Sequence, residues 1–526
     1  MPLKLSLPET GEGLQLKAET RPRRVKAWLE AMPLANIVEA ATSVCDALIS
    51  LNRNPLDAVT RLKLLELYTT AINNLTPDLQ HKYTLVALPL PEKSRQAANL
   101  ARRLFLELAY GYKILLVERL EKKRIGFGGR VHLALLIQRT IAALSKALCA
   151  FYKTYSPTPP GIWSEIHQLA HLALERNLHN EPVDRGRNSI SATYKQIVLL
   201  ALENPYKLMQ GEVDRVNDYL AEYGDLAKLY PMQATQSSLG VFLVNLDSDA
   251  SPRSLEMDHA KGSNYILLST DALVLNLQDQ ISKLESGKPP KALNLPDYAK
   301  LPSYLNLMRH LLKDWTLLPK RKFQRMANNN IMEMCVGLRA ASHFISFQPE
   351  ATEMETLDFR GIEQSGSRAM GKPEQSQFVT SRWAATNESA GGLALKFISG
   401  STQPIRIGEL IALRSQDSQN WNIGVVRRVF SGKPEHLELG VQMLAPTASP
   451  ITIKPVVAGP KDTFQAALLL PEIRSLQQPA TIVAAPATYR SKLEYLLYQS
   501  SGISSVRAMR LIEQTTSFDQ FQFSIE

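Results

Sequence analysis

The sequence predicts a multidomain α + β protein: an N-terminal all-α helical bundle or hairpin array, followed by a C-terminal antiparallel β-barrel with a β-rich tail. A chain of 526 residues is long enough for several domains of roughly 150 residues each. Between residues 34 and 230 apolar residues recur three and four positions apart, which is the period of an amphipathic helix. After residue 378, short β-prone runs alternate with turn residues.

Seven segments of the N-terminal half carry the helical period, and their short connections favour a bundle or an array of helical hairpins. Pro55 stands at the first turn of one segment and Ser189 at the N-cap of another, as helix entries prefer. The predicted helices are Ala35–Leu51, Pro55–Asn73, Pro91–Lys123, Val131–Tyr155, Ile162–Asn177, Ser189–Glu203 and Gly211–Leu229. We therefore expect an all-α interaction domain at 34–230, after a flexible segment at 1–33.

Residues 231–316 mix both patterns, so we expect a connector there. Two runs, Gly240–Leu246 and Asn264–Ser269, are typical of strands, and Leu273–Leu284 and Pro302–Trp315 of helices. The tail at 447–526 contains short β-prone runs separated by prolines. It forms either a second small β-subdomain or strands that extend the first barrel.

Charge and cysteine content limit the partners and the compartment. A net charge of +10 and a pI near 9.3 suit an anionic partner, but charge alone does not choose among a nucleotide, a nucleic acid and a membrane surface. The three cysteines, Cys45, Cys149 and Cys335, are widely spaced, which indicates a reducing cytoplasm. The N-terminus lacks the apolar region of an export signal, and the chain lacks a run of 18 apolar residues, so we expect no membrane span.

One stretch, Asn387 to Leu395, combines a turn with polar residues in a pattern found nowhere else in the chain. An Asn and a Ser two positions apart end an extended run, and two glycines follow. Leu393 and Leu395 then occupy every second position, as in a strand with one apolar face. This order is typical of strand, tight turn and strand. Asn387 and Ser389 fall on the same side of an extended chain, so both can face one ligand. Gly391 and Gly392 permit a positive φ and a close approach to the backbone.

The pattern Asn-x-Ser-x-x-Gly at 387–392 resembles the second motif of the PilZ family, small β-barrels that bind cyclic di-GMP. The first motif of that family, Arg-x-x-x-Arg, is matched by Arg321 and Arg325, before a predicted strand at Ile331–Val336. The resemblance covers residues 317–446, where Ile407–Leu413, Trp421–Val429 and Leu439–Leu444 look like the later strands of the family. The two motifs lie farther apart than a compact barrel needs, and we expect an inserted loop at 347–378.

The resemblance implies a cyclic di-GMP site made of Arg321, Arg325, Asn387, Ser389 and Gly392. Arginine suits this chemistry because a guanidinium bonds the O6/N7 edge of guanine in a fork, stacks on a purine and pairs with phosphate. Asn387 and Ser389 would bond the second guanine or a phosphate, and Gly392 would keep the turn open.

Catalytic and metal sites are not expected, and neither is a cofactor other than the suspected ligand. Nothing in the sequence combines a nucleophile, a base and an orienting group, so we expect no enzyme activity. His167 and His171 are four apart on a predicted helix, which is metal-ligand spacing, but a third ligand is lacking and we assign them to a helix surface.

Two functions follow from the resemblance. The first is a cytoplasmic, bacterial cyclic di-GMP receptor that couples nucleotide binding at the barrel to contacts between the helical domain and an unknown protein partner. The second is an adaptor or scaffold whose PilZ-like barrel no longer binds nucleotide. DNA or RNA binding is not expected because no basic helix with interleaved aromatic residues, and no known reading motif, is present.

Overall fold

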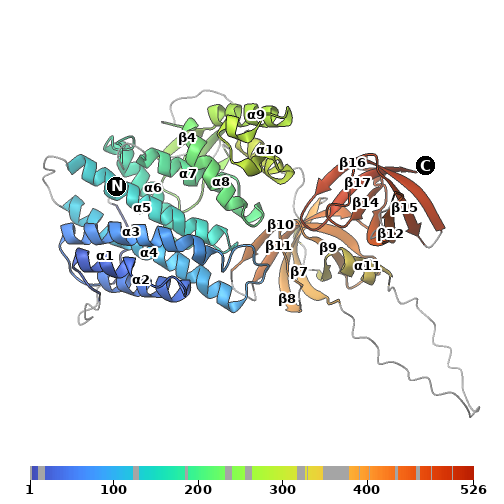
Figure 1. Cartoon of the computed structure of the whole chain (residues 1–526), viewed down its shortest axis with the longest axis horizontal. Coiled ribbons are helices and arrows are strands. Elements are labelled where there is room, and N and C mark those ends of the chain that lie inside the picture. Colours follow the sequence, from blue (N-terminus) through green and yellow to red (C-terminus); the bar gives the residue numbers. More distant parts are fainter. Residues whose placement is uncertain are drawn as a thin grey trace, which may run out of the picture. The chain divides into compact units, whose positions relative to one another are not determined.

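The computed structural model divides the chain into two compact units (Figure 1). The helical unit comprises Met1–Val86 and Leu90–Arg321, and the barrel unit comprises Ala87–Pro89 and Lys322–Glu526. The structure describes residues 3–9, 18–121, 129–183, 188–231, 240–254, 264–316, 326–327, 330–346, 378–389, 391–401, 403–432, 436–457, 463–474, 477–499 and 502–525.

The helical unit begins with a series of antiparallel helices that matches the predicted all-α pattern. These helices are α1 (Pro22–Glu30), α2 (Ile37–Asn52), α3 (Ala58–Gln80), α4 (Glu92–Glu121), α5 (Gly129–Tyr152), α6 (Ile162–Glu175), α7 (Ile190–Leu202) and α8 (Glu212–Tyr223). Ser189 caps α7 as expected, because its hydroxyl accepts a hydrogen bond from the Ala192 N–H at 3.0 Å.

The prediction of a flexible segment at 1–33 is wrong for the part that forms α1. Pro22 fits the first turn of this helix, where its missing N–H costs nothing. Val25 is fully buried and Leu29 packs against the core, so tertiary contacts hold a helix that is short on its own.

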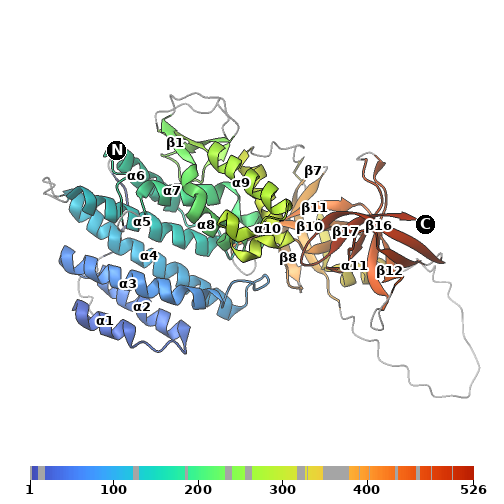
Figure 2. The ribbon, with the colours of Figure 1, turned by 45° about the horizontal axis from the view of Figure 1, so that its top comes forward.

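Helices α4 and α5 form the centre of the unit, where α4 packs against α2, α3 and α5 (Figure 2). Gly111 allows the close approach of α3, because a Cβ at this position would lie 2.4 Å from Leu65 Cδ2. Among the described helices, α5 is long and apolar enough to cross a membrane, but 72% of its most apolar window is buried inside the unit. Core packing therefore accounts for its apolar character.

Residues 231–316 are not a separate connector, because they share the core of the helical unit. A four-stranded sheet in the order β1-β4-β2-β3 packs there with α9 and α10. Its elements are β1 (Lys228–Pro231), β2 (Val241–Asn245), β3 (Arg253–Ser254), β4 (Tyr265–Ser269), α9 (Asp271–Glu285) and α10 (Pro302–Thr316). Trp315 is fully buried, and its indole N–H donates to the Leu199 carbonyl at 3.3 Å, across 116 residues. Such distant contacts are invisible to local patterns.

His167 lies in the core rather than on a helix surface. Its Nδ1 is 2.8 Å from the Tyr194 hydroxyl and its Nε2 is 2.8 Å from the Ala250 carbonyl. Burial lowers the pKa of His167, so the imidazole is neutral and both ring nitrogens have structural partners. Within the described part of the chain, no group of His, Cys, Asp or Glu residues could hold a metal ion.

The first barrel of the barrel unit is a sheet that closes on itself. Its strands follow the order β5-β7-β6-β9-β10-β11-β8, and β7 also pairs with β8. The elements are β5 (Met326–Ala327), β6 (Ile331–Val336), α11 (Leu338–Ser346), β7 (Ser381–Ser389), β8 (Gly392–Gly400), β9 (Leu410–Ser415), β10 (Asn422–Ser431) and β11 (Leu437–Ala445). The loop predicted at 347–378 lies outside the described residues except for Phe378.

The tail forms a second closed barrel in the order β12-β13-β14-β17-β16-β15, which decides between the two alternatives for this region. Its strands are β12 (Ser449–Pro455), β13 (Gln465–Leu470), β14 (Thr481–Ala484), β15 (Glu494–Gln499), β16 (Gly502–Gln514) and β17 (Asp519–Ile525). Helix α11 packs on β12 and β13, and Arg427 of β10 forms a two-bonded ion pair with Glu513 of β16 at 2.5 and 2.6 Å. The two barrels therefore share one packed interface.

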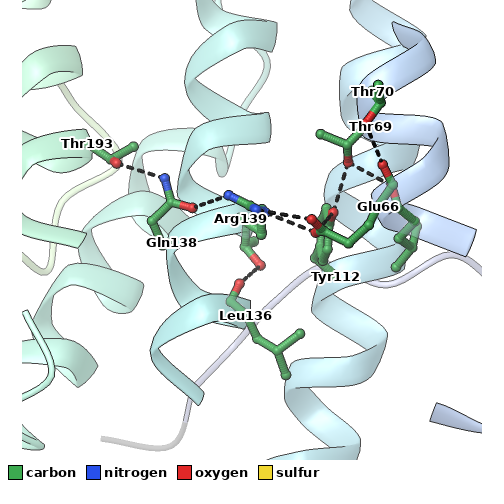
Figure 3. A network of polar contacts seen from close by, with 10 residues as sticks. Glu66, Thr69, Thr70, Tyr112, Leu136, Gln138, Arg139 and Thr193 are labelled. Carbon is green, nitrogen blue, oxygen red and sulfur yellow. Dashed lines mark hydrogen bonds and ion pairs between the residues drawn. The ribbon is translucent and has the colours of Figure 1, made fainter. Parts of the chain in front are cut away.

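A polar network ties four helices of the helical unit together (Figure 3). The Arg139 guanidinium on α5 donates to both carboxylate oxygens of Glu66 on α3, at 2.9 and 3.0 Å. The Tyr112 hydroxyl on α4 donates to the same carboxylate at 2.6 Å. Gln138, which accepts from Arg139 at 3.1 Å, donates to the Thr193 hydroxyl on α7 at 3.0 Å. The network restrains the relative rotation of these helices, because its hydrogen bonds connect side chains of α3, α4, α5 and α7.

We expect Arg139→Met to lower the free energy of unfolding of the helical unit by about 2 to 3 kcal/mol, since Glu66 loses two charge-assisted hydrogen bonds and Gln138 loses one. The control is Arg309→Met, which breaks an exposed pair with Glu285 (2.6 Å) and should cost less than about 1 kcal/mol. Urea unfolding followed by far-ultraviolet circular dichroism measures both. Equal losses in the two variants would show that the network does not stabilise the unit.

Candidate ligand site

The hairpin of β7 and β8 carries three of the predicted ligand residues. Asn387 and Ser389 lie at the end of β7, next to the turn, and Gly392 is the first residue of β8. The predicted order of strand, tight turn and strand is confirmed. Asn387 pairs with Ala394, and Ser389 pairs with Gly392.

A β-bulge at Thr386 decides which face of the barrel the two polar side chains occupy. Trp383 and Ala385 are buried in the barrel (0% and 1% exposed), and strict alternation would turn Asn387 and Ser389 inward as well. The register shifts between Ala385 and Asn387, so one extra residue enters β7 there. Beyond the bulge, Asn387 stands opposite Ala394, whose neighbours Leu393 and Leu395 point inward. Asn387 and Ser389 therefore share the outer face.

The same outer face continues along β7 into a hollow with basic walls. Its volume is about 770 Å³, and its lining includes Arg382, Arg414, Glu333, Thr380 and Ser418. Arg382 is exposed and pairs in register with Glu333 of β6, which in turn pairs with Arg414 of β9. Neither arginine is among the ligand residues predicted from the sequence. Arg382 alternates with buried residues of β7, and this alternation could have placed it on the outer face, whereas Arg414 follows a run of buried residues in β9 without alternation.

The Glu333 carboxylate bonds one of the two arginines of this hollow and stands in register with the other. Arg414 donates to Glu333 at 2.5 Å and stacks over the Trp421 ring at 4.7 Å. Burial raises the pKa of Glu333. Hydrogen bonds from Arg414 and Thr380, together with the charges of Arg414 and Arg382, lower it by more, so the pKa lies below its ordinary value. One carboxylate thus stands between two guanidinium groups, and the local charge stays positive.

Strand β5 pairs with the end of β7 that carries the second motif. Arg321 and Arg325 lie outside the described residues, so the structure does not place their side chains. Strand β5 begins at Met326, the residue after Arg325, and it pairs with β7: Met326 with Glu388 and Ala327 with Asn387. The described chain resumes after the first motif at β5, directly beside Asn387 and Glu388 of β7.

Gly392 has a packing role in the barrel. It does not adopt a positive φ, and a Cβ at this position would lie 2.3 Å from the carbonyl oxygen of Val441 on β11. Only glycine lets the two backbones come this close. The Ser389 hydroxyl donates to the Gly392 carbonyl at 3.3 Å, which helps to hold the turn.

Comparison with known families identifies the barrel. Residues 241–360 and 345–450 match the model of the middle PilZ domain of the cyclic-di-GMP receptor FimW. The chain is a PilZ-domain protein. The match to the PilZ model begins in the sheet of the helical unit, so the family domain is longer than the PilZ barrel itself. Residues 23–234 match the N-terminal domain of FimW, and residues 451–525 match its C-terminal β-barrel domain.

The three matches occur in chain order, and one curated relative contains the same series. The cyclic-di-GMP receptor FimW of Pseudomonas aeruginosa is 25% identical over 560 aligned positions, which cover 96% of this chain and 90% of the relative. No solved structure matches the chain. The PilZ domain is thus embedded in the same three-part organisation in both proteins.

We expect Gly392→Ala to destabilise the PilZ barrel by about 1 to 3 kcal/mol, because the added methyl group meets the β11 backbone, which cannot move alone. Ser389→Ala is the matched control in the same turn and should cost less than about 1 kcal/mol, since it loses one long hydrogen bond. Thermal unfolding of the barrel unit measures both without ligand. An unchanged midpoint in Gly392→Ala would contradict the packing role.

Proposed function

We propose that this protein is a cyclic di-GMP receptor of the bacterial cytoplasm, and that the nucleotide binds to the outer face of the PilZ barrel. Arg321, Arg325, Asn387, Ser389 and Gly392 make up the proposed site. The observation that carries the proposal is the pairing of β5 with β7, in which Met326 stands opposite Glu388 and Ala327 opposite Asn387. Met326 directly follows the first motif in the sequence, and Asn387 belongs to the second motif, so this pairing supports a site made by both motifs.

The chemistry of the face fits a dinucleotide with two phosphates and two guanines. The Asn387 amide offers donors and an acceptor to a base edge, and the Ser389 hydroxyl serves a base or a phosphate. Arginines supply forked bonds to guanine and charge for phosphate. Lys396 of β8 is exposed on this face, next to Ala394, and Arg382 and Arg414 extend its positive charge. These basic groups favour an anionic ligand over a neutral one.

The name of the relative supports the same ligand, because FimW of Pseudomonas aeruginosa is described as a cyclic-di-GMP receptor. Receptor function without catalysis agrees with the sequence, which lacks a set of catalytic residues. Cys45, Cys149 and Cys335 are all free, as expected in a reducing cytoplasm. In this proposal the helical unit makes contacts with a protein partner, and binding of the nucleotide by Arg321 and Arg325 changes those contacts.

Isothermal titration of the full chain with cyclic di-GMP tests the proposal. We expect micromolar or tighter binding, at least tenfold weaker binding after Arg321→Ala or Arg325→Ala, and no measurable binding in the double variant, since each charge-assisted bond contributes about 1.5 to 3 kcal/mol. Asn387→Ala should weaken binding several-fold. The control is Arg474→Ala with Arg510→Ala, which removes the same charge from exposed positions of the second barrel.

Absence of heat from folded wild-type protein would overturn the receptor and favour the scaffold, in which the PilZ barrel binds no nucleotide. Equal weakening in the control double variant would show that net charge alone governs binding, and would contradict the assigned site.

A further inference from the structure

Residues 3–9 of the chain form an extended segment that lies against α4 and α6 without forming a helix or strand of its own. Side chains of the two helices bond its backbone directly. The Lys4 N–H donates to Gln168 Oε1 at 2.8 Å, and the Ser6 N–H donates to Glu165 Oε1 at 2.6 Å. The Lys113 ammonium donates to the Ser6 carbonyl at 3.2 Å. Helical side chains therefore recognise a peptide backbone here.

The Ser6 hydroxyl completes a buried ion pair between the two helices. Lys113 Nζ lies 2.5 Å from Glu165 Oε2, and these side chains are only 2% and 8% exposed. The hydroxyl donates to Glu165 Oε1 at 2.6 Å and accepts from Lys113 Nζ at 3.0 Å. An ammonium has three N–H donors, so Glu165, the Ser6 carbonyl and the Ser6 hydroxyl use all of them. Buried charges need such complete bonding to offset their lost hydration.

Two leucines that precede Ser6 give this contact apolar anchors. Leu3 and Leu5 are half-buried and pack against the core of the helical unit, whereas Lys4 is exposed. Leu7 is 43% exposed and leaves the contact. The segment thus presents two alternate leucines and a hydroxyl, in the order Leu-x-Leu-Ser, to a slot lined by Lys113, Glu165 and Gln168.

We propose that this slot is a peptide-binding site, that residues 3–9 are its tethered occupant, and that an extended segment of a partner protein with the pattern Leu-x-Leu-Ser or Leu-x-Leu-Thr competes for it. The segment makes its bonds with the slot rather than with a helix or strand of its own, so it can leave as a unit while α4 and α6 stay folded. The slot recognises backbone groups, one hydroxyl and two leucines, and a partner can supply all of these.

The tether sets the strength that a competitor needs. A segment joined to its site by a short linker acts at an effective concentration on the order of millimolar, so a free peptide binds the intact chain weakly. Weakening the tethered segment therefore opens the slot to a partner. Neither the motif residues of the PilZ barrel nor the nucleotide takes part, so this inference stands apart from the proposed receptor function.

The test uses the full chain and a fluorescent synthetic peptide of residues 3–9. Ser6→Val removes the hydroxyl from the tethered segment and leaves Lys113 and Glu165 each one bond short. We expect the peptide to bind this variant at least tenfold more tightly than wild type, and a peptide with Val in place of Ser to bind at least tenfold more weakly. Leu7→Val, a change at an exposed neighbouring position, should behave as wild type. Hydrogen exchange should show α4 and α6 still protected in Ser6→Val.

Three results would overturn the proposal. The peptide could fail to bind either chain, it could bind Ser6→Val no more tightly than wild type, or Ser6→Val could lose protection of α4 and α6. The last result would make residues 3–9 a fixed part of the core instead of an exchangeable occupant.

Discussion

The proposed ligand face depends on one extra residue in β7. Thr386 interrupts the strict alternation that puts Trp383 and Ala385 inside the PilZ barrel. Without this bulge the Asn387 amide would enter an apolar core, where an unpaired polar group costs several kcal/mol, on the order of 2 to 7. With the bulge, Asn387 and Ser389 face outward in line with Ala394, while the barrel keeps its aromatic core. The bulge thus turns Asn387 and Ser389 toward the outer face while the core of the PilZ barrel stays packed.

Around this bulge, backbone pairing does the positioning and side chains supply the chemistry. Strand β5 pairs with β7 beside Asn387, and Gly392 lets β8 lie against the backbone of β11. The positive charge comes from the neighbouring strands, where Glu333 holds Arg414 and stands in register with Arg382. The PilZ motif glycine is therefore a requirement of the barrel, and its loss would affect folding before it affected binding.

The sequence was sufficient for features with a local period or a local turn chemistry. Helical spacing located α2 to α8, and the Asn-x-Ser-x-x-Gly pattern located the hairpin and the shared side of Asn387 and Ser389. It was not sufficient where distant contacts decide: α1 has one fully buried residue, and Trp315 joins the sheet region to α7 across the chain. The bulge could not be predicted either, because Thr386 is a good strand former and nothing local marks it as the extra residue.

Hydrogen exchange of the full chain with and without cyclic di-GMP tests the central claim most directly, since it reports where the nucleotide binds as well as whether it does. The account predicts that bound nucleotide slows backbone exchange in the first motif through β5 (residues 321–327) and in the β7–β8 turn (residues 387–392), and leaves β12 to β17 of the second barrel unchanged. Protection confined to the second barrel or to the helical unit, with no change at either motif, would contradict it.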